Sequence, residues 1–321
     1  MKRLLCAALA AAVLLAAPAA WAKTYVIAVN QFVEHPALDA VLRGFQDALK
    51  EKGVACEYKV HNAQANTATT NQIAQTTAGE NPDLVLAIAT PSAQAQAQVI
   101  KKAEHMAKVP LIFSAVTDPL GAKLVPDLKH PGGNVTGVSD LTPVDKHLAM
   151  IMDFLPKLKS VGVVYNAGEA NSKTLVQLLR QAAAAKGVKV EEAIPAKTGD
   201  VYAAGKSLVG RCDAVYVPTD NTVISGLESL VKVCEQNKLP LFAGDVDSVP
   251  RGCVAALGFD YYLHGRQAGA MAARILGGAS PADTPVEFQQ GMNLDINLKA
   301  AKAMGVTVTD ALKQKAHKVL E

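Results

Sequence analysis

The sequence predicts an α/β protein built from two similar lobes, each a doubly wound parallel sheet. Apolar runs rich in β-branched residues alternate along the chain with amphipathic helical patterns, as in parallel sheets that are covered by helices on both faces. The stretch that opens at Asp83 is also repeated, without a gap, from Asp213. In each copy a proline, Pro110 or Pro240, opens the next apolar run 27 positions later. This duplication predicts two lobes that face each other across a cleft.

The first 22 residues are predicted to be a secretory signal peptide and not part of the fold. Lys2 and Arg3 precede an apolar run at 4–17, and Ala20-Trp21-Ala22 matches a cleavage site. The run is shorter than the roughly 20 residues that a membrane-spanning helix needs. We therefore expect cleavage before Lys23 and a periplasmic protein.

The first half reads as a strand-helix-strand unit followed by the first copy of the repeat. Residues 23–30 form a continuous apolar run, as expected of a strand that is buried on both faces. Pro36 suits the first turn of a helix, and apolar residues at helical spacing follow it. A strand at 54–60 and a polar helix at 66–78 lead into the repeat. After the repeat, a strand at 135–138 is expected to cross to the second lobe.

The second half follows the same order. A strand at 161–165 is followed by a short loop and by a helix that starts at Ser172. The second copy of the repeat leads to a strand at 253–259 and a helix at 261–276. A short helix at 297–304 completes the pattern.

Four polar loops take equivalent places in the two copies of the repeat. The register sets 90–92 opposite 220–222, and 114–117 opposite 244–247. Parallel sheets collect such loops at the carboxyl ends of their strands, where ligands bind. We therefore expect the loops to line the cleft and to bind a small molecule.

The two copies differ in the chemistry of these loops. In the first copy, Thr90, Ser92 and Thr117 add hydroxyl donors to the free N–H groups of a helix N-terminus, which suits a carboxylate. In the second copy, Asp220 and Asp245 offer charged acceptors to an ammonium group. Hydrogen-bond donors on one lobe that face carboxylates on the other predict a zwitterion, such as an amino acid, as the ligand.

Each candidate also has a purely structural interpretation. Ser92 is a good helix cap, and Asp247 is an ordinary turn residue. Phe32, after the first strand, either stacks on the ligand or packs in the core. Asn166, in the matching loop of the second half, either contacts the ligand or holds its own turn. For His35, in the same loop as Phe32, a capping or surface role is expected.

Composition excludes several classes of function. Without Lys2 and Arg3 the chain carries 30 basic and 29 acidic side chains, interspersed along the sequence, so nucleic-acid binding is not expected. The G-x-S-x-G, P-loop, H-E-x-x-H and G-x-G-x-x-G motifs are absent, and the histidines have no ligand spacing. We expect no enzyme activity, no cofactor and no metal.

Four cysteines follow the predicted signal peptide, and none lies in a C-x-x-C pair. Cys212 and Cys253 both precede predicted strands, so one hypothesis is a disulfide between them at one end of a sheet. The alternative is that the cysteines are buried free thiols.

Several segments resemble the ABC-transporter solute-binding proteins of the tryptophan or aromatic amino-acid type. These segments are EHPALDAVLRGF (34–45), ATPSAQA (89–95), FSAVTDP (113–119), PGGNVTGVSD (131–140), VGVVYNAGEANS (161–172), YVPTDN (216–221) and FAGDVDS (242–248). The resemblance implies the first fold type of the periplasmic binding proteins, with a three-segment hinge near Gly137, Phe259 and Pro285. The lobes would then be 23–137 with 260–284, and 138–259 with 285–321.

The resemblance also implies roles for individual residues. Ser92 and Thr117 match the hydroxyls that hold the ligand carboxylate in the branched-chain amino-acid receptors. The carbonyl of Ala115 and an acid after the F-x-G strand end match the partners of the ammonium. That acid is one position away from the family pattern, so Asp220, Asp245 and Asp247 all remain candidates. The predicted ligand-binding residues are Phe32, Thr90, Ser92, Ala115, Thr117, Asn166, Asp220, Asn221 and Asp245.

The expected function is that of a monomeric periplasmic receptor. Its lobes would close on a hydrophobic or aromatic amino acid, namely tryptophan, phenylalanine or tyrosine, and present it to an inner-membrane ABC permease. The alternatives are a binding protein for another small solute, such as a sugar or a nucleoside, and a secreted α/β enzyme.

Overall fold

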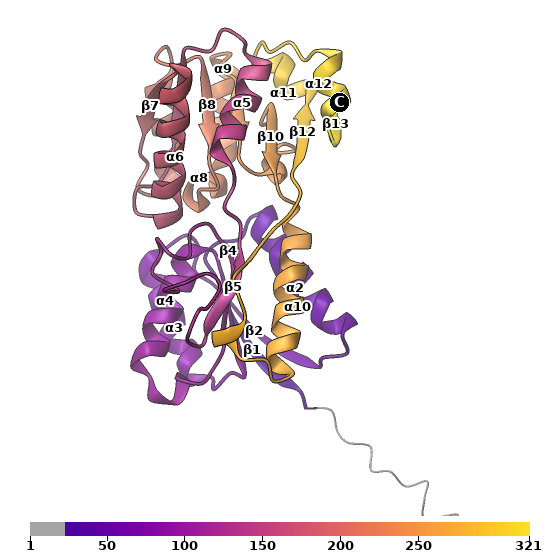
Figure 1. Cartoon of the computed structure of the whole chain (residues 1–321). Coiled ribbons are helices and arrows are strands. Elements are labelled where there is room, and N and C mark those ends of the chain that lie inside the picture. Colours follow the sequence, from indigo (N-terminus) through magenta and orange to yellow (C-terminus); the bar gives the residue numbers. More distant parts are fainter. Residues whose placement is uncertain (1–22) are drawn as a thin grey trace, which may run out of the picture.

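The computed structural model describes residues 23–321, and the predicted signal peptide at 1–22 lies outside the described residues. The chain forms two lobes, stacked one above the other in Figure 1 and joined by extended crossing segments. Each lobe is a mostly parallel sheet with helices on both faces, so the predicted fold class is confirmed. No helix among the described residues is long and apolar enough to cross a membrane.

The first lobe contains a six-stranded sheet in which all neighbouring strands are parallel. The strand order is β11 (Glu287–Phe288), β5 (Val135–Ser139), β4 (Leu111–Val116), β3 (Leu84–Ile88), β1 (Tyr25–Gln31) and β2 (Cys56–Asn62). Two pairs of helices cover its faces: α3 (Thr67–Gly79) with α4 (Thr90–Lys102), and α2 (Pro36–Glu51) with α10 (Tyr261–Leu276) (Figure 1).

The second lobe contains a seven-stranded sheet, parallel except where β12 pairs with β10. The strand order is β13 (Lys318–Leu320), β12 (Asn293–Asn297), β10 (Ala255–Gly258), β9 (Leu241–Ala243), β8 (Ala214–Val217), β6 (Ser160–Val164) and β7 (Lys189–Ala193). Its helices are α5 (Val144–Phe154), α6 (Ala170–Lys186), α7 (Val201–Leu208), α8 (Asn221–Ser225), α9 (Leu227–Gln236), α11 (Leu298–Ala303) and α12 (Asp310–Lys315).

The repeat in the sequence corresponds to one topology used twice. The central strands follow the order β5-β4-β3-β1-β2 in the first lobe and β10-β9-β8-β6-β7 in the second. The aligned segments therefore become β3, α4 and β4 in one lobe and β8, α8, α9 and β9 in the other. This equivalence sets the carboxyl ends of corresponding strands at the junction of the lobes.

The lobe boundaries differ from the predicted ones at two of the three crossings. The β5 strand continues to Ser139 and pairs with β4 up to that residue, so the chain leaves the first lobe after Ser139 and not at Gly137. The β11 strand pairs with β5 inside the first lobe, which moves the third crossing beyond Phe288. The second crossing lies between β10 and α10, next to Phe259. In both corrected places, continued sheet pairing keeps the chain in the first lobe for a few more residues.

The cysteine hypothesis of a Cys212–Cys253 disulfide is wrong, because all four cysteines among the described residues are free thiols. Cys212 precedes β8 and Cys253 precedes β10, but β9 lies between these two strands. Strands two places apart in a sheet are separated by roughly 9 to 10 Å. A disulfide needs Cα atoms within about 7 Å, so the sheet order rules the pair out.

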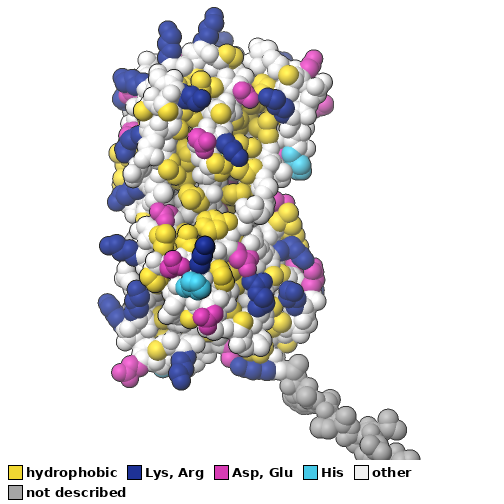
Figure 2. Space-filling view, in the orientation of Figure 1, with side chains coloured by type: hydrophobic (Ala, Val, Ile, Leu, Met, Phe, Trp, Pro, Cys, Tyr) yellow, Lys and Arg dark blue, Asp and Glu magenta, His cyan; other side chains and the backbone are white. Residues whose placement is uncertain are grey.

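Charges of both signs are mixed over the surface. On the face shown in Figure 2, Lys and Arg side chains are scattered over both lobes among Asp and Glu, and hydrophobic side chains lie between them and across the junction of the lobes. This face shows no single basic patch of the kind that binds nucleic acid.

Helices α2 and α10 approach each other closely because glycines lie in their contact. A Cβ atom on Gly265 of α10 would lie 2.0 Å from the carbonyl oxygen of Val41, and one on Gly44 of α2 would lie 2.1 Å from that of Tyr262. These distances are too short for any side chain. Since α10 starts directly after the second crossing, its contact with α2 also fixes the place where the chain enters the first lobe.

We predict that Gly265→Ala lowers the free energy of unfolding by about 1 to 3 kcal/mol, because the added methyl group must push the two helices apart. Urea unfolding followed by circular dichroism measures the change. Gly79→Ala in α3 is the matched control, since a Cβ there meets nothing within 4 Å. The control should be neutral or slightly stabilising, because alanine favours a helix over glycine. Equal effects of the two substitutions would contradict this packing argument.

Candidate ligand-binding site between the lobes

Twelve residues from both lobes line a small cavity at the junction, which we call the central cavity. The first lobe contributes residues that follow β1 or lie at the end of β4, namely His35, Ala37, Leu38, Ala115 and Thr117. The second lobe contributes residues that follow β6, β8 and β9, namely Asn171, Thr219, Asn221, Ile224 and Asp245. Asp140 and Tyr261 come from the first two crossings. The cavity thus lies at the carboxyl ends of parallel strands, where α/β proteins bind ligands.

The central cavity contains four of the nine predicted site residues, Ala115, Thr117, Asn221 and Asp245. Phe32 and Asn166 line a neighbouring pocket nearer to solvent. Thr90, Ser92 and Asp220 line neither of these two spaces.

Asp245 places a buried carboxylate in the central cavity. It caps the short 3₁₀ helix Val246–Ser248, where Oδ1 accepts the N–H of Ser248 at 2.9 Å and Oδ2 accepts the hydroxyl of Ser248 at 2.7 Å. Burial raises the pKa of this carboxyl group, and the Ser248 hydrogen bonds oppose the shift. Each oxygen keeps a free lone pair, so Asp245 can still accept hydrogen bonds from a ligand.

Asp140 and Tyr261 join the cavity to the hinge. The Tyr261 hydroxyl donates to Asp140 Oδ2 at 2.7 Å, and Thr117 Oγ1 donates to Asp140 Oδ1 at 3.2 Å. Burial raises the pKa of the Asp140 carboxyl group. Sequence analysis did not include Asp140 or Tyr261 in the site. The available signal was their position at the crossings: Asp140 directly follows β5, and Tyr261 opens α10 three positions beyond the end of β10.

Ala115 has an unusual backbone conformation that shapes the cavity wall. Its φ angle is +53°, a left-handed conformation that non-glycine residues rarely adopt. The N–H of Ala115 donates to Nε2 of His264 at 2.9 Å, and the β4–β5 pairing shifts register between Phe113 and Val116. Burial lowers the pKa of His264 to about 4, which keeps its ring neutral and able to accept this bond. Bulges and strained residues of this kind are frequent at binding sites.

The hydrogen bonds that Asp220 accepts all come from residues of the second lobe. Asp220 is fully buried and caps α8, with Oδ1 accepting the N–H of Val223 at 2.8 Å. Its Oδ2 accepts the N–H of Asn166 and the hydroxyl of Ser172, both at 2.6 Å. Burial and the neighbouring Glu169 carboxylate raise its pKa. With these partners inside its own lobe, Asp220 is placed to hold two loops together and not to face the cavity.

The first turn of α4 also faces inward. The Ser92 hydroxyl donates to Asn30 Oδ1 at 3.1 Å and lies 3.3 Å from the hydroxyl of Thr70. Thr90 begins the helix, and its buried hydroxyl has no hydrogen-bond partner among the described residues. The structural interpretation therefore describes Ser92 better than the predicted contact with a carboxylate.

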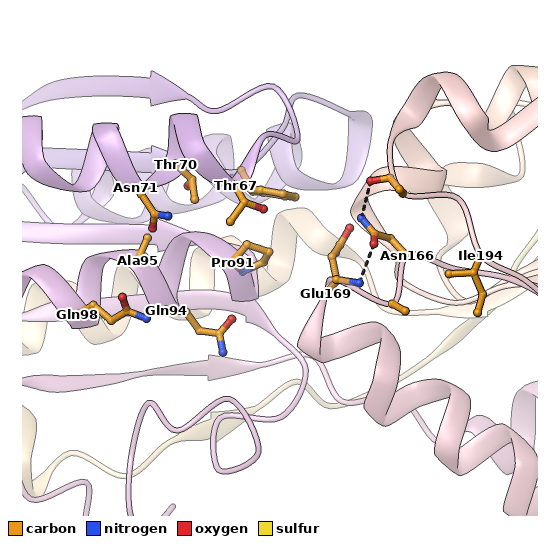
Figure 3. A pocket seen from close by; sticks show the side chains of 14 residues that line it. Thr67, Thr70, Asn71, Pro91, Gln94, Ala95, Gln98, Asn166, Glu169 and Ile194 are labelled. Carbon is orange, nitrogen blue, oxygen red and sulfur yellow. Dashed lines mark hydrogen bonds between the residues drawn. The ribbon is translucent and has the colours of Figure 1, made fainter.

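Beyond the central cavity, a pocket of about 560 Å³ opens between the lobes, which we call the outer pocket. Figure 3 shows Asn71, Gln94 and Gln98 of the first lobe across from Asn166 and Glu169 of the second. Its other lining residues are Phe32, Thr67, Thr70, Pro91, Ala95, Ala167, Gly168, Ile194 and Ala196. The outer pocket continues the cleft from the central cavity toward solvent.

Glu169 connects the two spaces and is not among the nine predicted site residues, although it lies in the same loop as Asn166. Its carboxylate lines the outer pocket and accepts the side-chain N–H of Asn221 at 2.6 Å and the hydroxyl of Thr222 at 2.7 Å. It also accepts the side-chain N–H of Asn171 at 3.2 Å. Glu169 thereby holds Asn171 and Asn221, which line the central cavity. Among residues 23–321, no group of three or more His, Cys, Asp and Glu side chains is arranged to hold a metal ion.

We predict that Asp220→Asn lowers the free energy of unfolding by about 1 to 3 kcal/mol, because an amide nitrogen cannot accept both bonds that Oδ2 accepts now. Urea unfolding measures this loss. Asp260→Asn is the matched control: Asp260 caps α10 by accepting one N–H, from Leu263 at 3.1 Å, and Asn caps equally well. A similar loss in both variants would show that Asp220 acts as an ordinary cap.

Comparison with known proteins agrees with this architecture. The family model described as ABC transporter substrate binding protein matches residues 26–320. A tyrosine-binding protein from Clostridioides difficile (strain R20291) is 39% identical over 282 residues, which cover 87% of this chain and 80% of that protein. A glucose-galactose binding protein from Geobacillus stearothermophilus, 17% identical with a TM-score of 0.63, covers 85% of this chain and 97% of its own and shares the fold alone.

Two solved structures of similar identity differ in how well they superpose. An ABC domain from Streptococcus pneumoniae in complex with L-Trp is 34% identical, has a TM-score of 0.88 and covers 93% of this chain and 100% of its own. The ligand-free, open structure of a substrate binding protein from Clostridium difficile is 38% identical, has a TM-score of 0.68 and covers 92% and 99%. This chain therefore superposes better as a whole on the complex than on the open structure. Since the family model spans nearly all of residues 23–321, the chain belongs to the family of ABC transporter substrate-binding proteins.

Proposed function

We propose that this chain captures an aromatic amino acid in the central cavity and delivers it to an inner-membrane ABC permease. In this proposal the signal peptide at 1–22 is removed and the mature protein acts as a monomer in the periplasm. Lobe closure around the ligand is a hinge motion of the three crossings.

The observation that carries the proposal is the buried carboxylate of Asp245. Burying a charged group is costly unless it is paired. Its hydrogen bonds within the described residues come from Ser248, and Arg251, which lies near enough to lower its pKa, is paired with Glu228. An α-ammonium group in the central cavity would supply the missing cation. A sugar offers no such charge, so this feature favours an amino acid over the neutral solutes.

The outer pocket and the relatives support an aromatic side chain. Phe32 lines the outer pocket, although its side chain is only 2% exposed and packs in the hydrophobic core of the first lobe. One relative is named a tyrosine-binding protein and another was solved with L-Trp. In this arrangement the ligand's α-carbon groups occupy the central cavity and its ring extends toward Phe32.

We propose binding without turnover. None of the twelve residues that line the central cavity is a serine or a cysteine, two of the residue types that serve as covalent nucleophiles. The best acid in the cavity, Asp245, already has a structural role as a cap.

A thermal-shift and calorimetric screen of residues 23–321 against the amino acids tests the function. A micromolar aromatic ligand at 1 mM should add about 4 kcal/mol to the free energy of unfolding. The single tryptophan of the chain, Trp21, lies in the signal peptide, so tryptophan fluorescence of the mature protein reports bound L-Trp directly. A shift with sugars or nucleosides and with no amino acid would refute the proposal.

We predict that Asp245→Asn weakens binding of the aromatic amino acid tenfold or more, because the amide cannot neutralise the ammonium group. The variant should remain folded, since Asn can still accept the N–H of Ser248. Asp247→Asn is the control: Asp247 neighbours Asp245 but does not line the central cavity. Isothermal titration calorimetry gives both affinities. A loss confined to Asp247→Asn would assign the ammonium partner to Asp247.

A further inference from the structure

His35 lines the central cavity with one ring nitrogen that caps a helix and a second that is unpaired among the described residues. It caps α2, with Nδ1 accepting the N–H of Leu38 over a long distance of 3.5 Å. The side chain is buried and lines the central cavity. Its Nε2 is buried and has no hydrogen-bond partner among the described residues.

The capping bond determines which nitrogen carries the proton. A neutral imidazole has one donor and one acceptor nitrogen. Because Nδ1 accepts from Leu38, the proton of the neutral ring lies on Nε2. Burial lowers the pKa of His35 to about 4, and the positive charge of Arg251 adds to the shift, while the side chain of Asn221 from the second lobe opposes it. The ring is therefore neutral at pH 7. The first lobe therefore presents a neutral N–H donor to the central cavity.

The second lobe presents unpaired polar atoms of its own to the same cavity. Asn171 donates its side-chain N–H to the backbone carbonyl of Thr219 at 3.0 Å, which leaves its buried Oδ1 without a partner among the described residues. The hydroxyl of Thr219 is likewise buried and unpartnered there. Buried polar atoms without partners are rare and costly. A donor on one lobe and acceptors on the other fit a ligand that both accepts and donates.

We propose that His35 is a ligand-binding residue whose Nε2–H donates a hydrogen bond to the carboxylate of the captured amino acid, while Asn171 across the cleft accepts from the ammonium group. This inference rests on the proposed function, since it assumes an amino acid in the cavity. The carboxylate oxygens are the acceptors that every amino acid carries. His35 takes the part that sequence analysis gave to Ser92, whose hydroxyl is turned toward Asn30.

The test uses His35→Asn, which keeps a side-chain oxygen to cap α2 but has no donor at the position of Nε2. We expect L-tyrosine and L-tryptophan to bind about 10- to 100-fold more weakly, as for the loss of a hydrogen bond to a charged group. Thermal unfolding without ligand verifies that the variant is folded. His35→Ser, which caps equally well, replaces it if the asparagine variant fails to fold.

A second ligand identifies the group that His35 contacts. L-Tyrosinol keeps the ring and the ammonium group but has a hydroxymethyl group in place of the carboxylate. Wild-type protein should prefer L-tyrosine to L-tyrosinol, and His35→Asn should reduce this preference at least tenfold. In addition, NMR of ¹⁵N-histidine-labelled protein should show the His35 ring signals moving when L-tyrosine is added.

Unchanged affinity of His35→Asn, or His35 ring signals that do not move, would overturn the inference and leave His35 as a helix cap only. A loss that is the same for L-tyrosine and L-tyrosinol would overturn its assignment to the carboxylate. Failure of wild-type protein to bind any amino acid would instead refute the proposed function, and with it this inference. The two failures are thus distinguished by the wild-type titration.

Discussion

Polar and charged atoms that are buried at the junction of two lobes must find partners, and this requirement governs the site. Asp245 lies there as a carboxylate that is hydrogen-bonded to Ser248 and has no ion-pair partner among the described residues. His35 and Asn171 bring unpaired polar atoms to the same space. Leaving such atoms dry and unpaired costs free energy in the closed protein. A zwitterion is the kind of molecule that offsets this cost on both lobes at once.

The comparison of Asp220 with Asp245 shows how the same residue type obtains different roles. Both follow a strand of the second lobe and both cap a helical turn. Asp220 is fully buried, accepts hydrogen bonds from three residues of its own lobe and does not line the central cavity. Asp245 accepts from Ser248 alone and lines the central cavity. The difference lies in the hydrogen-bond donors. For Asp220 they come from the loop after β6, from α6 and from α8, whereas for Asp245 they come only from the turn that it caps.

The fold could be predicted because the pattern of apolar residues is a local signal and because the repeat has a regular spacing. The equal spacing from Asp83 and from Asp213 correctly indicated two similar sheets, and the structure shows that their central strands also share one order. The register also placed strand ends, so Thr117 and Asp245 were expected at the cleft and do line the cavity. Side-chain direction was not predictable, because it depends on partners that are distant in the sequence. Ser92 turns toward Asn30, 62 positions away, and Tyr261 reaches Asp140 across 121 positions.

Away from the hinge, direct side-chain hydrogen bonds between the lobes are few among the described residues. Among residues 23–321, the one direct side-chain hydrogen bond across the cleft joins Thr174 to Asp118 over a long 3.5 Å. The hinge itself connects to the cavity through Asp140, which accepts from Tyr261 at the second crossing and from Thr117 at the cavity wall. A ligand shifts a two-state equilibrium only by its differential affinity for the two states. In the proposed binding mode, the ligand contacts His35 on one lobe and Asp245 on the other at the same time only when the cleft is closed. Its binding therefore stabilises the closed arrangement of the lobes relative to an open one.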